Sequence, residues 1–155
     1  GFEAAKKAIM NPDIDFIQVP CNAWDHRMIE SEVFEHAREH NVLCFVRSVF
    51  LQGLLLMDKE QVKNKLPTAY NAAKKWDEIV IKKQTEKEVL AMSFAAELEC
   101  PLVIGVENKS QLKDNNNLLK NMIIDINVND LKEYSQGPIS ENVIMPFKWH
   151  MKGDK

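Results

Sequence analysis

The sequence predicts an α/β fold in which short parallel strands alternate with helices. Three apolar segments have the length and boundaries of buried strands: 14–20, 42–46 and 101–106. Segments with helical spacing of apolar residues precede and separate them. Because strands separated by helices pair in parallel through right-handed crossovers, we expect one parallel sheet with helices packed on one side.

The first third of the chain supplies two of these strands. The pattern predicts, in order, a helix over 3–10, a strand over 14–20, a loop over 21–28, a helix over 29–40 and a strand over 42–46. Asn11 and Pro12 end the first helix, and Asn41 ends the second. In the second helix Val33 and Ala37 recur on one face, and we expect this face to cover the sheet.

The rest of the chain is mostly helical in pattern. We expect helices over 68–83 and 88–98, the third strand, and a helix over about 108–119. Three pairs of residues predict helix N-terminal caps: Asp58 with Gln61, Thr85 with Glu88, and Asn108 with Gln111. The C-terminal segments are less distinct: 122–128 fits a strand or a helix, 129–134 favours a short helix, and 137–155 predicts an extension along the surface.

Composition narrows the class of protein. With 155 residues the chain is long enough for one domain with a real core. Apolar residues make up 45% and charged residues 28%, as in soluble globular proteins. The net charge of -3 and the pI near 5.8 give no basic face for nucleic acid. No apolar run approaches the roughly 18 residues that span a bilayer, so we expect neither a nucleic-acid nor a membrane partner.

The N-terminus and the cysteines bear on processing and location. The first residues lack the basic and apolar regions of a signal peptide. The chain opens without Met on a helical pattern, so we expect that residue 1 is not the natural start.

The chain contains three cysteines, Cys21, Cys44 and Cys100, an odd number, and they are set among apolar residues. This pattern predicts reduced, mostly buried thiols in a cytoplasmic protein, with neither a disulfide frame nor a metal site.

The predicted strands end in polar or small residues. Four of these lie at or just past the carboxyl ends of the strands: Gln18, Ser48, Gly53 and Gly105. Residues at that edge of a parallel sheet converge in space, where α/β proteins commonly bind ligands. We therefore expect a rim that holds an anionic or amide group. The residues at this rim include no set for nucleophilic attack or proton transfer.

Two other clusters have candidate chemistry with simpler alternatives. Residues 36–40 spell H-x-x-E-H, a zinc-peptidase pattern, in which two His one helical turn apart share a metal. The alternative, which we favour, is a chance pattern on a partly solvated helix flank. Asp25 and His26 beside Arg27 resemble an acid–base pair, but no Ser or Cys nucleophile stands nearby. We expect them to form hydrogen bonds within their loop.

Three segments together carry a resemblance to a known family. They are 17–20 (IQVP) with Asn22 and Arg27 after it, 47–55 (RSVFLQGLL), and 103–107 (VIGVE) with Gln111, Leu112 and Asn115 after it. These segments resemble the sixth-, seventh- and eighth-strand segments of the aldo-keto reductases, in that family's order and spacing. The resemblance covers about residues 1–119.

The resemblance implies a (β/α)8 barrel that reduces a small carbonyl substrate with a nicotinamide cofactor. Gln18 would hold the nicotinamide carboxamide, and Ser48 with the backbone through Phe50 would contact the pyrophosphate. Gln52 and Gly53 would shape that loop. The cofactor-binding residues implied in this way are Gln18, Arg47, Ser48, Phe50, Gln52, Gly53, Gly105, Gln111, Asp114 and Asn115, of which the last four would surround the adenosine.

The chain departs from the family pattern near the cofactor. Arg47 stands where the family often has the Tyr that stacks on the nicotinamide. Val49 and Phe50 replace the usual Pro-Leu. The positions of the basic residues that usually grip the 2′-phosphate hold Gly105, Val106 and Gln111, with Lys109 or Lys113 as possible substitutes. Both NADP and NAD therefore stay open.

Nothing in the chain matches the family's first four strands, which supply the catalytic Asp, Tyr, Lys and His. We therefore expect one domain, 1–155, that is the C-terminal half of a barrel of about 250 residues. By itself this half should be inactive as a reductase. Its uncovered strand edges and inner sheet face predict self-association. The alternative is a non-enzymatic half-barrel module that binds a nucleotide or another protein.

Overall fold

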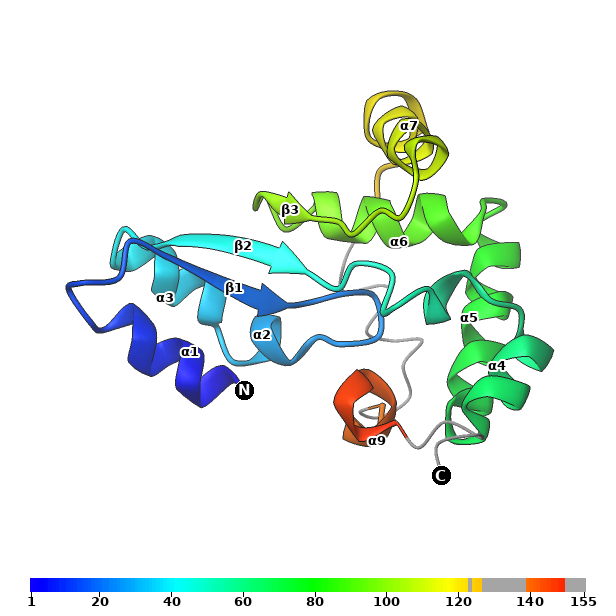
Figure 1. The fold of residues 1–155 in the computed structure, drawn as a ribbon, viewed down its shortest axis with the longest axis horizontal. Helices are drawn as coiled ribbons and strands as arrows, with labels where there is room; N and C mark the ends of the chain where they lie inside the picture. The colour runs from blue at the N-terminus through cyan, green and yellow to red at the C-terminus, as the bar shows by residue number, and fades with distance from the viewer. Residues whose placement is uncertain (123, 127–138, 150–155) are drawn as a thin grey trace.

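A computed structural model describes residues 1–122, 124–126 and 139–149 (Figure 1). Its centre is a three-stranded parallel sheet in the order β1-β2-β3, formed by β1 (Phe16–Pro20), β2 (Leu43–Arg47) and β3 (Leu102–Val103). Gln18 pairs with Phe45, and Arg47 pairs with both Pro20 and Val103. The predicted parallel sheet with intervening helices is confirmed.

Helices and single turns fill the connections. In chain order they are α1 (Phe2–Ile9), α2 (Arg27–Glu30), α3 (Val33–Glu39), η1 (Leu54–Leu56), α4 (Lys59–Lys65), η2 (Pro67–Ala69), α5 (Tyr70–Lys82), α6 (Lys87–Ala96), α7 (Lys109–Asn117), η3 (Leu118–Met122), α9 (Glu141–Ile144) and η4 (Pro146–Lys148). None of the helices in the described part of the chain has the length and apolarity that a bilayer crossing requires.

The predicted helix over 29–40 is wrong as a single element. The chain forms α2 and α3 instead, because Glu32 takes a left-handed conformation with φ of 54°. An α-helix cannot continue through such a residue, and the Glu32 N–H bonds to the Ile29 carbonyl and closes a tight turn. The expected apolar face survives the break, since Val33 and Ala37 are both buried.

Two of the three predicted helix caps are confirmed. Asp58 accepts hydrogen bonds from the backbone N–H groups of Glu60 and Gln61, and the Gln61 side chain accepts from the Asp58 N–H in return. Asn108 caps α7 by accepting from the Gln111 N–H at 3.0 Å. The predicted capping box at Thr85 is wrong: the N-cap of α6 is Glu86, which makes no side-chain cap bond.

The third strand is shorter and less buried than predicted. Pairing with β2 covers only Leu102 and Val103, whereas the apolar segment runs over 101–106. Val103 and Val106 are both 40% exposed. In the described structure β3 pairs with β2 along one edge and with no strand along the other.

The C-terminal tail contributes to the core. Val143, Ile144 and Trp149 are buried in the same apolar cluster as the helix side of the sheet. The Trp149 indole N–H donates to the Val143 carbonyl at 2.8 Å, which satisfies the buried donor. The surface extension predicted over 137–155 is thus attached to the core by these side chains, while the other residues of 139–149 stay at least partly exposed. The short helix predicted over 129–134 lies outside the described residues, as do 123, 127 and 128. Residues 124–126, where a strand or a helix was expected, form neither.

The two faces of the sheet differ in cover. Val19, Cys44 and Val46 point to the helix side and are buried. On the opposite face Phe16 is 60% and Leu43 is 50% exposed, and the Phe16 ring meets Phe45 edge-on at 5.9 Å. This open face is apolar at the amino ends of the strands. At the carboxyl ends it carries the exposed side chains of Gln18 and Arg47.

Candidate functional site

A cleft of about 700 Å³ lies past the carboxyl ends of β2 and β3. Its walls come from the loop after β2, from the segment after β3 and from α7. Seven of the ten predicted cofactor-binding residues line it: Ser48, Phe50, Gln52, Gly53, Gly105, Gln111 and Asn115. The structure thus brings together residues as far apart in the sequence as Ser48 and Asn115, which are 67 positions apart. This agrees with the expectation that the ends of parallel strands converge.

The loop after β2 is held in an unusual backbone conformation. Ser48, Leu51, Gln52 and Gly53 all have positive φ, between 46° and 78°. Such angles cost non-glycine residues free energy, so packing must hold them. Leu51 is 1% exposed and its N–H bonds to the Ser48 carbonyl at 2.9 Å, which pins the loop to the core. Ser48, Gln52 and Gly53 of this loop line the cleft.

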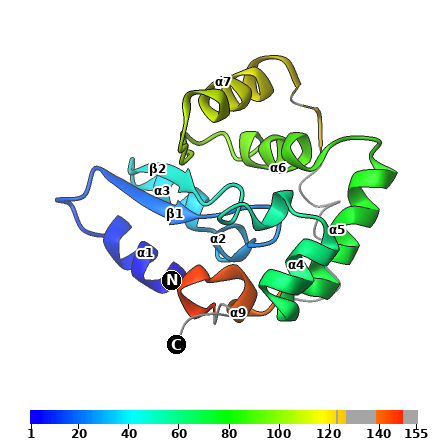
Figure 2. The same cartoon turned by 45° about the vertical axis from the view of Figure 1, so that its right-hand side comes forward.

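A second hollow of about 600 Å³ adjoins the first. It holds the remaining predicted residues of the nicotinamide side, Gln18 and Arg47, and it shares Ser48 and Gln52 with the cleft. Its other walls are α1 and residues 144–147, and Figure 2 shows α9 beside the start of α1. The two hollows therefore form one continuous rim across the strand ends. Gln18 sits within β1, two residues before its end.

An ion pair borders the second hollow. Asp25 is fully buried and receives two hydrogen bonds of 2.8 Å from the Arg27 guanidinium. The hydrogen bond to Asp25 raises the pKa of Arg27, and Glu141 lies 3.6 Å from the same guanidinium. His26 bonds the Ala23 carbonyl at 3.0 Å and stacks on Phe94. The expected loop hydrogen bonding of this segment is confirmed.

The adenosine side is arranged by α7. Gln111 lines the cleft, and its side-chain oxygen accepts a hydrogen bond from the Glu107 N–H at 2.7 Å. Asn115, one turn further along the helix, is half-buried in the same wall. Asp114 is placed differently from its predicted role: it is not among the lining residues, and it accepts a hydrogen bond from Ser110 Oγ. Lys109 and Lys113 do not line the cleft either.

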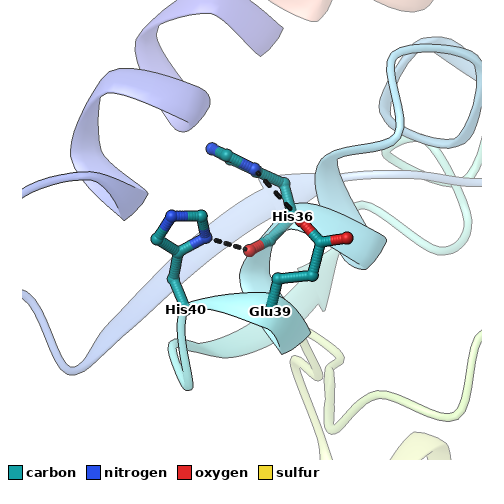
Figure 3. A group of neighbouring side chains, drawn as sticks. All are labelled: His36, Glu39 and His40. Atoms are coloured by element: carbon teal, nitrogen blue, oxygen red, sulfur yellow. Dashed lines mark hydrogen bonds and ion pairs between the residues drawn. The ribbon is translucent and has the colours of Figure 1, made fainter.

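The H-x-x-E-H residues gather on the flank of α3 (Figure 3). The nearest ligand atoms of His36, Glu39 and His40 lie within 4.8 Å of one another. His40 Nδ1 donates to the His36 carbonyl at 2.9 Å, and His36 Nδ1 lies 3.8 Å from the Glu39 carboxylate. Glu39 and His40 are exposed and His36 is half-buried, as expected of a partly solvated helix flank. None of the three lines either hollow.

Asn22 is a site residue whose role sequence reasoning missed. It is fully buried, its side-chain oxygen accepts from the N–H groups of Trp24 and Asp25, and its Nδ2 donates to the Ser48 carbonyl. The local signal was an Asn soon after the strand-ending Pro20, a residue type that often organises turns. The bond to Ser48, 26 positions away, has no sequence signal.

Comparisons with known proteins agree with this arrangement. A model of the aldo/keto reductase family matches residues 3–136. A search of curated proteins found no match. The three parallel strands with their helices form part of a (β/α)8 barrel of the kind that this family builds. Because the family match extends over most of the sequence, the chain belongs to the aldo/keto reductase family.

Proposed function

We propose that this chain carries the cofactor-binding side of an NAD(P)H-dependent oxidoreductase that reduces a small carbonyl compound to an alcohol. Membership of the aldo/keto reductase family supports the reaction class. The observation that carries the proposal is the continuous rim. The cleft holds the residues assigned to the pyrophosphate and, apart from Asp114, to the adenosine, and the adjoining hollow holds those assigned to the nicotinamide. A dinucleotide is an extended molecule with a nucleoside at each end. Two hollows that meet at Ser48 and Gln52 can hold one nucleoside each.

The loop after β2 offers donors for the pyrophosphate. In the described structure, no acceptor pairs with the backbone N–H groups of Val49, Phe50, Gln52 and Gly53. Free N–H groups in a loop of left-handed and right-handed residues bind anions well. Arg47, whose guanidinium donates to Ser48 Oγ at 3.2 Å, adds positive charge at the same point. We assign this loop to the pyrophosphate, with Ser48 and Phe50 on it.

The remaining roles divide between the two hollows. Gln18 is exposed on the open face of β1. Its side-chain amide has both an NH2 donor and a carbonyl acceptor, which can pair with the carbonyl and the NH2 of the nicotinamide carboxamide. Gly105, Gln111 and Asn115 surround the adenosine in the cleft. Asp114 acts from outside the lining, by holding Ser110 on α7. Among the described residues no lysine or arginine lines the cleft, and Glu107 does, so these residues offer no cation for a 2′-phosphate. NAD therefore stays a candidate beside NADP.

When bound, a reduced nicotinamide would supply hydride to the carbonyl carbon, and a proton donor must neutralise the oxygen. Among the residues that the structure describes, no tyrosine or lysine lines either hollow to act as that donor. We infer that the chain corresponds to the C-terminal half of a barrel, as one domain, and that it binds the cofactor without turning over an aldehyde. The family match gives no support to the alternative of a non-enzymatic module.

Nucleotide titration of the purified chain tests the proposal. NADH and NADPH are added separately, and the quenching of tryptophan fluorescence and the heat of binding are followed. We expect saturable binding of at least one of them, weakened about tenfold by Gln52→Ala, which removes a residue shared by both hollows. Gln84→Ala, an exposed loop residue outside both hollows, is the control. Absence of binding to either nucleotide would contradict the proposal.

A further inference from the structure

The sheet register sets two cysteines opposite each other. Val46 pairs with Leu102, and the Val46 N–H bonds to the Pro101 carbonyl at 2.9 Å. Two residues back along each segment stand Cys44, in β2, and Cys100, just before β3. A hydrogen bond between their side chains shows that the two thiols meet there. Neighbouring strands lie about 4.8 Å apart. This separation falls within the range of roughly 4.4–6.8 Å between the Cα atoms of disulfide-bonded cysteines.

The two thiols are already in contact and differ in environment. Their side chains share a hydrogen bond, which lowers the pKa of Cys100 to about 7. The same bond, with burial, raises the pKa of Cys44. Arg38, on α3, adds positive charge that favours the Cys100 thiolate. Cys44 is only 5% exposed, whereas Cys100 is half-buried, so reagents in solvent reach Cys100 first.

We propose that Cys100 and Cys44 are a peroxide-sensitive thiol pair, in which Cys100 is oxidised first and Cys44 then closes a disulfide with it. The pair lines neither hollow, so this modification site is independent of the proposed cofactor binding. The disulfide would join Cys44, the second residue of β2, to the residue two positions before β3. The backbone pairing between β2 and β3 covers only two residue pairs. The disulfide would therefore strengthen the attachment of β3, and of the cleft wall that follows it, to β2.

The chemistry needs one molecule of hydrogen peroxide. The Cys100 thiolate attacks one peroxide oxygen, the O–O bond breaks, and a sulfenic acid forms while the departing hydroxide takes a proton to become water. The Cys44 sulfur then attacks the Cys100 sulfur and displaces hydroxide, which combines with the Cys44 proton as a second water. Both thiols lose one electron each to the peroxide. A dithiol reductant reverses the bond.

Intact-mass analysis and peptide mapping of the full chain test this proposal. After treatment with an equimolar amount of hydrogen peroxide, we expect the loss of two hydrogens and one cross-linked peptide pair containing Cys44 and Cys100. Alkylation should then label one cysteine, where the reduced chain, unfolded in denaturant, labels all three. Cys21→Ser is the control and should form the same disulfide, because the proposal assigns no role to that fully buried thiol.

Single substitutions separate the two roles. Cys44→Ser should leave a sulfenic acid on Cys100 that dimedone traps, while Cys100→Ser should react with peroxide at least tenfold more slowly. These readouts do not depend on nucleotide binding, so they stand whether or not the cofactor proposal does. A disulfide that contains Cys21, a disulfide between two chains, or dimedone labelling of Cys44 in place of Cys100 would each overturn the assignment.

Discussion

The Asn22 side chain donates a hydrogen bond from Nδ2 to the carbonyl oxygen of Ser48 at 3.1 Å. This bond joins the turn after β1 to the first residue of the loop after β2, where both hollows meet. Because Asn22 also accepts from two backbone N–H groups of its own turn, one buried amide organises the ends of two neighbouring strands. The shape of the rim therefore depends on a side chain that lines neither hollow.

Asn22→Ala should destabilise the protein. The substitution removes the acceptor of the buried Trp24 N–H, and a loss of this kind costs about 1–3 kcal/mol. The Asp25 N–H keeps its bond to the Asn22 backbone carbonyl. Urea unfolding followed by far-UV circular dichroism measures the change. Asn71→Ala, at an exposed position of α5, is the matched control and should change the free energy of unfolding by less than about 0.5 kcal/mol. Equal effects of the two substitutions would show that the Ser48 contact is unimportant.

Gly53→Ala should also destabilise the protein, for a reason of backbone geometry. Gly53 has φ of 78°, a conformation that costs a residue with a Cβ about 1 kcal/mol, although no atom lies within 4 Å of the added carbon. Gly105→Ala is a close control, because it also meets open space but lacks a positive φ. Thermal unfolding should show a lower Tm for Gly53→Ala alone, and a similar Tm for both variants would argue against a strained loop.

The open apolar face should drive self-association of the isolated chain. Phe16 and Leu43 lie on the uncovered side of the sheet and are at least half exposed. Sedimentation velocity at high concentration should show species heavier than the 17.8 kDa chain, and Leu43→Thr should shift them toward the monomer. Ile81→Thr removes an apolar side chain that is 75% exposed on α5, away from this face. It should leave the distribution unchanged, and a monomeric wild-type chain would refute the prediction.

Acid should weaken the attachment of the C-terminal segment. The hydrogen bond from Lys148 at 2.6 Å lowers the pKa of Glu141, and Arg27 adds to the effect. A carboxylate with a lowered folded-state pKa contributes stability above its unfolded-state pKa and loses it as pH falls through the folded value. Glu141→Gln should therefore reduce Tm slightly at neutral pH and have no effect at strongly acid pH. Glu97→Gln, which removes another exposed carboxylate at the end of α6, away from Lys148 and Arg27, is the matched control.

Local patterns in the sequence were sufficient for the order of the elements and for most of the rim. Apolar runs and helical spacing gave the parallel sheet, and the Asp58 and Asn108 caps follow from residues three positions apart. Ser48, Gly53 and Gly105 were found because they follow strands, and parallel strands end at one edge. These features depend on interactions over short distances along the chain.

Other features required the folded structure. The helix break at Glu32, the loss of the Thr85 cap and the short β3 result from packing that overrides local preference. The placement of Asp114 outside the cleft is also a matter of which way α7 lies against the strand ends.

By itself, the sequence determined the α/β class, the parallel strand order and the residues that gather at the strand ends, because periodicity and turn residues act locally. Only the tertiary structure decided that Asn22 holds Ser48, that Cys44 faces Cys100 and that Trp149 enters the core. Each of these contacts joins groups that are distant in the chain or set by strand register. Their geometry depends on how whole elements pack, which residue type and spacing do not specify.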